Sequence, residues 1–183
     1  QSSLRRMKKT KSKEIVLSGL FIALGLLVPM AFHAIGGTGP VFLPMHLPVL
    51  MGGFILSPVY ALMVGVVTPL LSSALTGMPV LMPMAFIMMV ELGIYGLAVS
   101  LLREKGVNNV LTLVGAMVLG RIAAGLMVAM LVSFIGIRFA PPITFVAGAI
   151  TTGIPGILIQ LIFIPILLVA VKKAAPDLIS GKR

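Results

Sequence analysis

Charged side chains are rare inside the apolar stretches of this chain, and two of them could form a buried ion pair. Glu91 precedes the basic residue Arg103, and Arg121 follows Val110 at the start of the next apolar stretch. At about 1.5 Å per helical residue, each lies roughly 17–18 Å from the end of its stretch. The two stretches are joined by a short turn, and an unpaired charge at this depth is costly. We therefore expect Glu91 and Arg121 to be in contact.

This expected pair has more than one interpretation. It could be a structural clamp between helices. It could also be a ligand site in which Arg121 binds an anionic group of the ligand and Glu91 orients the remainder of that ligand. Gln160 precedes Lys172 by a similar length of apolar sequence. It is therefore expected at the same depth and could join either arrangement. A proton relay is disfavoured, because a carboxylate beside a guanidinium is expected to stay ionised.

Other polar residues lie at the ends of apolar stretches. His46 lies between two prolines, where its ring can donate or accept a hydrogen bond. Ser73 and Thr76 lie at the end of another stretch, and Thr151 and Thr152 lie shortly before Pro155. Each hydroxyl could bond to its own helix or line a cavity. A metal site is not predicted, because no acid, Cys or second His lies at ligand spacing from His46; a nickel or cobalt site shared with His33 is a weaker alternative.

Enzymatic chemistry is hard to build from this sequence. The chain has no Cys, its single acid within an apolar stretch is Glu91, and it contains no HExxH, GxSxG or Walker motif. We therefore predict that the chain is not an enzyme and that it uses no cofactor.

Composition and charge place the chain in a membrane. Hydrophobic residues make up 59% of the sequence and charged residues only 10%, with a mean hydropathy of +1.19. The net charge of +10 could suggest nucleic-acid binding. However, twelve of the fourteen Lys and Arg residues lie in three clusters at the borders of apolar stretches, as in cytoplasmic segments of membrane proteins. These clusters are Arg5, Arg6, Lys8, Lys9, Lys11 and Lys13; Arg103 and Lys105; and Lys172, Lys173, Lys182 and Arg183.

The apolar stretches predict an all-α integral membrane protein with a bundle of six transmembrane helices. Six crossings place both termini and all three basic clusters in the cytoplasm. The second crossing is short and contains Pro48. The chain then consists of a basic N-terminus (1–13), one membrane domain (14–171) and a basic C-terminus (172–183). The predicted crossings are 14–32, 45–56, 59–75, 80–102, 110–135 and 143–171.

The predicted outer connections are rich in Gly and Pro and almost free of charge. They cover residues 33–44, 76–83 and 136–142. Backbone that is not helical is tolerated at membrane depth only where protein or water satisfies its polar groups. These connections are therefore either tight apolar turns or caps over a binding cavity that opens to the outside.

Several of these features together resemble the substrate-binding S components of energy-coupling factor (ECF) transporters. The features are six crossings in a chain of 183 residues, long outer loops, and a first helix with small residues at Gly19 and Ala23. The sequence motifs that carry the resemblance are Phe42-Leu43-Pro44-Met45-His46-Leu47-Pro48-Val49-Leu50, Thr76-Gly77-Met78-Pro79 and Leu119-Gly120-Arg121.

This resemblance implies a high-affinity binding subunit for a vitamin or vitamin precursor in a prokaryotic plasma membrane. It implies a transmembrane coupling subunit, which would dock on the face of Gly19 and Ala23, and two ATPase subunits as partners. A family site near the outer face favours His46, Ser73, Thr76 and the loop from Met78 to Met84 as the substrate-binding part of the chain. Glu91, Arg121 and Gln160 would form its floor or be structural.

The chain has no Trp, nine Phe and two Tyr, so a large flat substrate is favoured less than a smaller one, which could be carboxylated. Two alternatives stay open at this point. One is a small self-sufficient transporter or channel, and the other is a membrane assembly subunit without a ligand.

Overall fold

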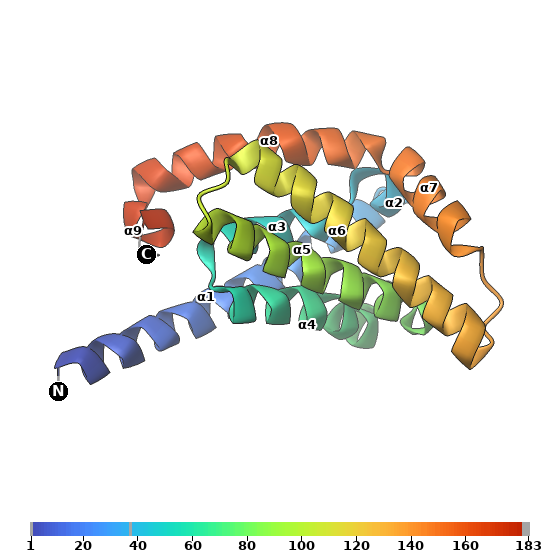
Figure 1. The fold of residues 1–183 in the computed structure, drawn as a ribbon, viewed down its shortest axis with the longest axis horizontal. Helices are drawn as coiled ribbons and strands as arrows, with labels where there is room; N and C mark the ends of the chain where they lie inside the picture. Colours follow the sequence, from blue (N-terminus) through green and yellow to red (C-terminus); the bar gives the residue numbers. More distant parts are fainter. Residues whose placement is uncertain (1, 37, 181–183) are drawn as a thin grey trace.

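A computed structural model of the chain describes residues 2–36 and 38–180. This part of the chain is helical and contains no strand (Figure 1). Five helical segments are long and apolar enough to cross a membrane. The helices are α1 (Ser2–His33), α2 (Gly39–Phe42), α3 (His46–Ile55), α4 (Pro58–Thr76), α5 (Phe86–Glu104), α6 (Asn109–Met130), α7 (Pro142–Thr152), α8 (Ile154–Ala174) and α9 (Pro176–Ser180), with π-helical turns η1 (Leu81–Ala85) before α5 and η2 (Leu131–Ile135) after α6.

Two of the predicted crossings differ from the helices in the structure. The second, expected over 45–56, is the ten-residue helix α3, which at about 1.5 Å per residue is too short to span a hydrocarbon core of about 30 Å. The sixth, expected over 143–171, is not one helix, because it breaks at Gly153 into α7 and α8. Pro155 explains the break, since proline lacks the N–H that would bond to the carbonyl of Thr151 four residues earlier and its ring clashes with that carbonyl.

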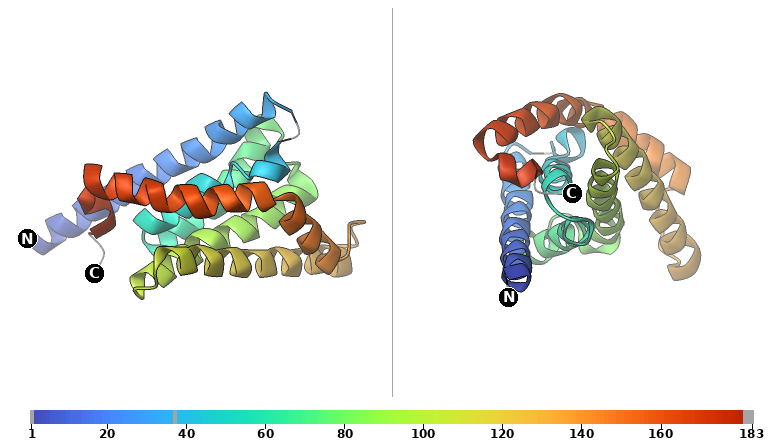
Figure 2. Two further views of the ribbon diagram at one scale, coloured as in Figure 1. Left: turned by 90° about the horizontal axis from the view of Figure 1, so that it is seen from above. Right: turned by 60° about the vertical axis from the view of Figure 1, so that its left-hand side comes forward.

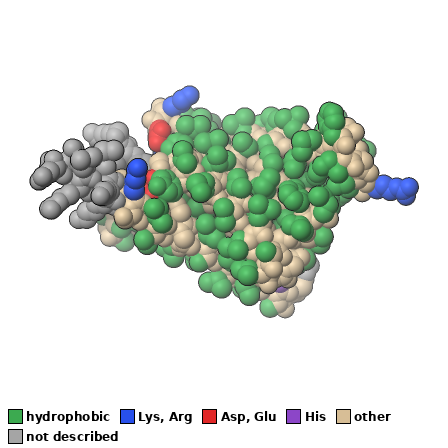
Figure 3. Space-filling model, turned by 90° about the horizontal axis from the view of Figure 1, so that it is seen from below, with side chains coloured by type: hydrophobic (Ala, Val, Ile, Leu, Met, Phe, Trp, Pro, Cys, Tyr) green, Lys and Arg blue, Asp and Glu red, His purple; other side chains and the backbone are tan. Residues whose placement is uncertain are grey.

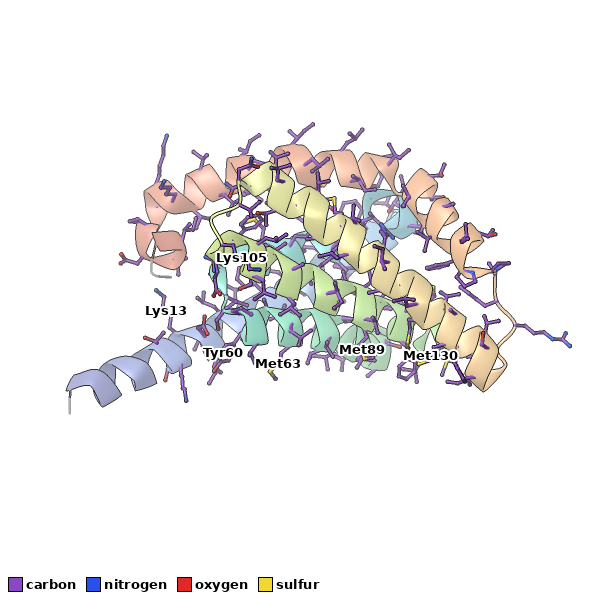
Figure 4. The ribbon with its side chains drawn as sticks, in the orientation of Figure 1. Lys13, Tyr60, Met63, Met89, Lys105 and Met130 are labelled. Carbon is purple, nitrogen blue, oxygen red and sulfur yellow. The ribbon has the colours of Figure 1, made fainter. Side chains whose placement is uncertain are left out.

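The long helices run back and forth along one axis of the molecule. The start of α1, the connection between α5 and α6, and the end of α8 all lie at the same end (Figures 1 and 2). The basic residues of these segments are therefore gathered at one end. Lys13 and Lys105 lie there, whereas Met130 lies towards the opposite end (Figure 4). We call the end with Lys13 and Lys105 the basic end.

The surface between the two ends is apolar. Hydrophobic side chains cover most of the face shown in Figure 3; the charged side chains lie toward one extremity, and a single basic side chain projects at the other. Large apolar residues on the outer faces of the long helices are exposed, for example Val16 on α1 and Leu126 on α6. This arrangement is the one a bilayer requires, because hydrocarbon is an apolar solvent and only the ends of the bundle meet water.

The centre of the bundle is built by α3, α4 and α5, which pack at backbone distance. A Cβ atom on Gly65 of α4 would lie 2.1 Å from the carbonyl oxygen of Leu92 on α5, and a Cβ on Gly96 of α5 would lie 2.4 Å from the carbonyl oxygen of Ala61. Small residues of this kind let membrane helices approach closely and pack by van der Waals contact. The result is a tightly packed scaffold around α5.

Helix α7 is packed quite differently. None of its residues is buried, and no Cβ added at Gly148 would meet another atom within 4 Å. It contacts α6, where a Cβ on Gly125 would lie 3.1 Å from a side-chain carbon of Val146, and it joins α8 at the break at Gly153. It forms a wall on the outside of the bundle, at the end away from the basic end (Figure 1).

Candidate functional site

A cavity of about 530 Å³ lies at the end of the bundle away from the basic end. Its wall is formed by the end of α1, the segment from α2 to the start of α3, the η1 turn, and one face each of α5, α6 and α7. Most of the lining is apolar, as in small-molecule sites, which occupy about 300–1,000 Å³. The polar side chains in its lining are His33, His46, Glu91, Arg121, Thr144 and Thr152.

Three buried polar side chains from three different helices form one hydrogen-bonded trio in this wall. The Nε2 atom of His46 lies 2.6 Å from Oε1 of Glu91, and Nη1 of Arg121 donates to Oε2 of Glu91 at 3.3 Å. The three residues expose only 4%, 3% and 7% of their surfaces. Both carboxylate oxygens of Glu91 are thus satisfied, one by α3 and the other by α6.

The local sequence explains how these helices meet at Glu91. The ring of Tyr95, one turn after Glu91, packs edge-on against His46 with ring centroids 5.5 Å apart. Gly120 precedes Arg121, and a Cβ there would lie 1.9 Å from two carbon atoms of the Tyr95 ring. Glycine at position 120 therefore lets α6 approach α5 closely enough for Arg121 to reach Glu91.

The trio leaves part of its hydrogen-bonding capacity unused. Within the described residues, the buried atoms Nε and Nη2 of Arg121 and Nδ1 of His46 have no hydrogen-bond partner. The Nε and Nη2 atoms form one edge of the guanidinium, which presents two parallel N–H groups and fits a carboxylate with two hydrogen bonds. Because buried donors without partners are costly, this edge of Arg121 is a candidate anion-binding group.

Helix α7 contributes a further face to the cavity. Thr144, Gly148 and Thr152 are spaced four residues apart, so they lie along one face of α7, and all three line the cavity. The opposite face, with Val146 and Ala147, lines a second, apolar groove between α6, α7 and α8, and Arg121 borders both this groove and the cavity. Helix α7 is thus a thin wall between the cavity and the apolar exterior.

Gln160 does not join the ion pair, although its predicted depth suggested that it would. Its Nε2 atom donates to the backbone carbonyl of Leu43 at 3.5 Å, and the buried Oε1 atom has no partner within the described residues. Gln160 therefore fixes α8 to the segment between α2 and α3. The residue that completes the trio is His46, which the sequence placed separately at the outer mouth.

Ser73 and Thr76 lie near the end of α4 and do not line the cavity. The hydroxyl of Thr76 donates to the carbonyl of Ser72 at 2.8 Å, and that of Ser72 donates to the carbonyl of Met78 at 2.6 Å. The hydroxyls of this region hold the turn after α4. The cavity wall here is formed by Met78, Pro79 and Val80, which belong to the loop from Met78 to Met84 that the family resemblance favours.

Some cavity residues were not identified from the sequence. Thr144 and Gly148 were not singled out, although their spacing with Thr152 in an apolar segment is a detectable signal. The direct bond between His46 and Glu91 had no such signal, since the two residues are 45 positions apart.

The described residues also bear on metal binding. Within them, no group of three or more His, Cys, Asp or Glu side chains could hold a metal ion. His33 and His46 both line the cavity, but the Nε2 atom of His46 is engaged by Glu91.

An apolar multi-helix body with a cavity and buried polar side chains at one end is typical of a multi-pass membrane protein, and the cavity is its candidate small-molecule site. The family model described as ECF transporter, substrate-specific component, matches residues 13–168 of the chain. The chain therefore belongs to this family, which provides transport components rather than enzymes. No match was found among curated proteins or solved structures.

Proposed function

We infer that this chain is the membrane-embedded subunit that binds a vitamin or vitamin precursor for uptake, and that the cavity beside α7 is its substrate site. The observation that carries this proposal is the trio of His46, Glu91 and Arg121 in the wall of an otherwise apolar cavity. A clamp between helices alone would not need a cavity at its side. A few placed polar groups in an apolar cavity are typical of sites that orient a small ligand.

The proposed topology has six crossings, with α2 and α3 together returning the chain between α1 and α4. It is supported by the position of α1 and α8, which respectively begin and end at the basic end. Basic segments of membrane proteins face the cytoplasm, so the basic end would be cytoplasmic and the cavity would open to the outside of a prokaryotic plasma membrane.

Energy would come from separate subunits, namely a transmembrane coupling subunit and two ATPases, as the family implies. Gly19 and Ala23 on α1 are the proposed docking face. Gly19 is exposed, and an added Cβ would meet nothing within 4 Å. This open position supports the assignment, because a partner helix could approach the α1 backbone there.

The proposed site is tested by filling the cavity. Gly148→Leu adds a side chain to a cavity-lining position with no neighbouring atom within 4 Å of the new Cβ, so the fold should tolerate it. We expect the purified wild-type chain in mild detergent to retain or be stabilised by one vitamin, measured by native mass spectrometry and thermal shift, and Gly148→Leu to lose that binding.

The matched control is Ala147→Leu, which adds similar bulk to the same helix on its groove face. This control should bind the ligand like the wild type. Equal binding by Gly148→Leu, Ala147→Leu and the wild type would contradict the cavity as the substrate site.

Docking is tested separately. Gly19→Leu should weaken co-purification with the coupling subunit while ligand binding by the isolated chain stays unchanged. Val118→Leu enlarges an exposed position on α6 and is the control. If both variants co-purify with the coupling subunit as the wild type does, Gly19 is not part of the docking face.

A further inference from the structure

We propose that the substrate carries a single carboxylate on a largely apolar body, and that the free edge of Arg121 holds this carboxylate. This inference rests on the proposed function and names the class of substrate for the same site. It starts from Arg121, whose side chain is nine-tenths buried and forms part of the cavity wall.

The geometry of the guanidinium selects a planar anion. Glu91 receives a hydrogen bond from Nη1 of Arg121, and within the described residues Nε and Nη2 have no partner. These two atoms lie on the same edge of the guanidinium and donate in parallel, which matches the two oxygens of a carboxylate. A neutral carbonyl would satisfy this edge with one oxygen and without charge assistance.

The charge of the trio disfavours a ligand with more than one negative charge. Glu91 and Arg121 cancel each other, so the trio sums to zero with a neutral His46 and to +1 with a protonated one. A phosphate ester carries a charge of about −1.5 to −2 near neutral pH and would leave more negative charge uncompensated in an apolar cavity than a monocarboxylate does. The free edge of Arg121 consists of N–H donors only, so it offers a cation no acceptor.

The rest of the cavity defines the body of the molecule. The walls beside the trio are apolar, including Leu43, Met84, Ile87 and Phe145. The face of α7 opposite the trio offers the hydroxyls of Thr144 and Thr152, which can donate or accept a hydrogen bond. The substrate is therefore an amphipathic monocarboxylate with an apolar body and at least one hydrogen-bonding group away from its carboxylate.

The experiment compares acids with their uncharged counterparts on the full chain in mild detergent. The probes are nicotinic acid with nicotinamide, pantothenic acid with panthenol, and biotin with biotinamide, with thiamine as a cation. We expect one acid to bind and its uncharged counterpart to bind roughly 10- to 100-fold more weakly, the factor set by losing charge-assisted hydrogen bonds. Equal binding of both members of a pair, or binding of thiamine alone, would overturn the proposal.

Two variants test whether the preference for an acid over its uncharged counterpart comes from Arg121. The neutral double variant Glu91→Gln/Arg121→Gln leaves no unpaired buried charge and should bind the acid no better than its uncharged counterpart. Arg121→Lys keeps the positive charge but lacks the two-point edge, and should weaken acid binding by about tenfold. Wild-type affinity for the acid in both variants would overturn the proposal.

The cavity-filling variant separates the two levels of inference. Gly148→Leu could lose all binding while the wild type binds the acid and the uncharged probe equally well. In that case the site would be correct and the assignment of a carboxylate to Arg121 would be wrong. Unchanged binding in Gly148→Leu would count against the proposed function itself.

Discussion

The two sides of the cavity are built in opposite ways. On one side, α4, α5 and α6 meet through glycines at backbone distance and hold Glu91 and Arg121 in buried positions. On the other side, α7 has no buried residue and presents Thr144, Gly148 and Thr152 to the cavity. The two sides therefore differ in role. The rigid side fixes the charged groups, and the loosely packed side covers the proposed ligand site.

The largest loss of stability should come from breaking the charged trio on the rigid side. Glu91→Gln leaves the buried guanidinium of Arg121 without a counter-charge, and we expect the free energy of unfolding to fall by about 3–5 kcal/mol. Unfolding of the purified variant in detergent by denaturant or heat measures this loss. The double variant Glu91→Gln/Arg121→Gln is the control and should recover most of the stability. A single variant as stable as the wild type would mean that the pair contributes nothing to the rigid side.

The same substitution at two glycines compares the two sides directly. Gly65→Ala places a Cβ 2.1 Å from a backbone oxygen of α5, so a helix must shift. We expect a loss of about 1–3 kcal/mol, as for other overpacked cores. Gly148→Ala enters open space within a helix, where alanine is favoured over glycine by about 1 kcal/mol. The unfolding temperature in detergent should therefore fall in Gly65→Ala and rise in Gly148→Ala. A shift of the same sign in both variants would refute the difference in packing between the two sides.

Much of the rigid side could be predicted from the sequence. The depth of Glu91 and Arg121 in neighbouring apolar segments indicated their contact, and the structure joins them at 3.3 Å. Counting depth failed for Gln160, because depth says nothing about the direction in which a helix turns its side chain. Gln160 faces Leu43 instead of the ion pair.

The loosely packed side was harder to predict. Hydropathy merges α7 and α8 into one apolar segment, since the break at Gly153 changes the backbone without changing polarity. On the rigid side, the position of His46 beside Glu91 was equally hard to predict, because it depends on how α3 enters the bundle, a tertiary property that no local pattern in the sequence contains.

A smaller loss of stability is expected from a substitution where α1 joins the rigid side. The carboxylate of Glu14 accepts a hydrogen bond from the backbone N–H of Ser57 at 2.8 Å and a second from its hydroxyl, which ties α1 to the connection between α3 and α4. Glu14→Gln weakens both bonds at a half-buried position, so we expect a loss of about 1 kcal/mol. Chemical unfolding measures it, with Glu104→Gln at an exposed position as the control. Equal stability of the two variants would show that this contact does not anchor α1.

The smallest change in stability is expected on α7, where the effect should appear in binding. Thr144→Val removes a hydroxyl from the cavity face and keeps the shape of the side chain. Its position is exposed, so the free energy of unfolding should change by less than about 0.5 kcal/mol. Losing one neutral hydrogen bond to the substrate should weaken affinity by roughly 3- to 10-fold, as measured by titration calorimetry.

Thr151→Val is the control for this last change, because it lies on the same helix but its hydroxyl donates to the carbonyl of Ala147 at 2.7 Å. It should bind substrate like the wild type. If Thr144→Val lowers stability but leaves affinity unchanged, α7 is part of the structural scaffold and the contrast between the two sides is wrong. If affinity falls while stability holds, α7 acts on the ligand through a face that the rigid side does not need for folding.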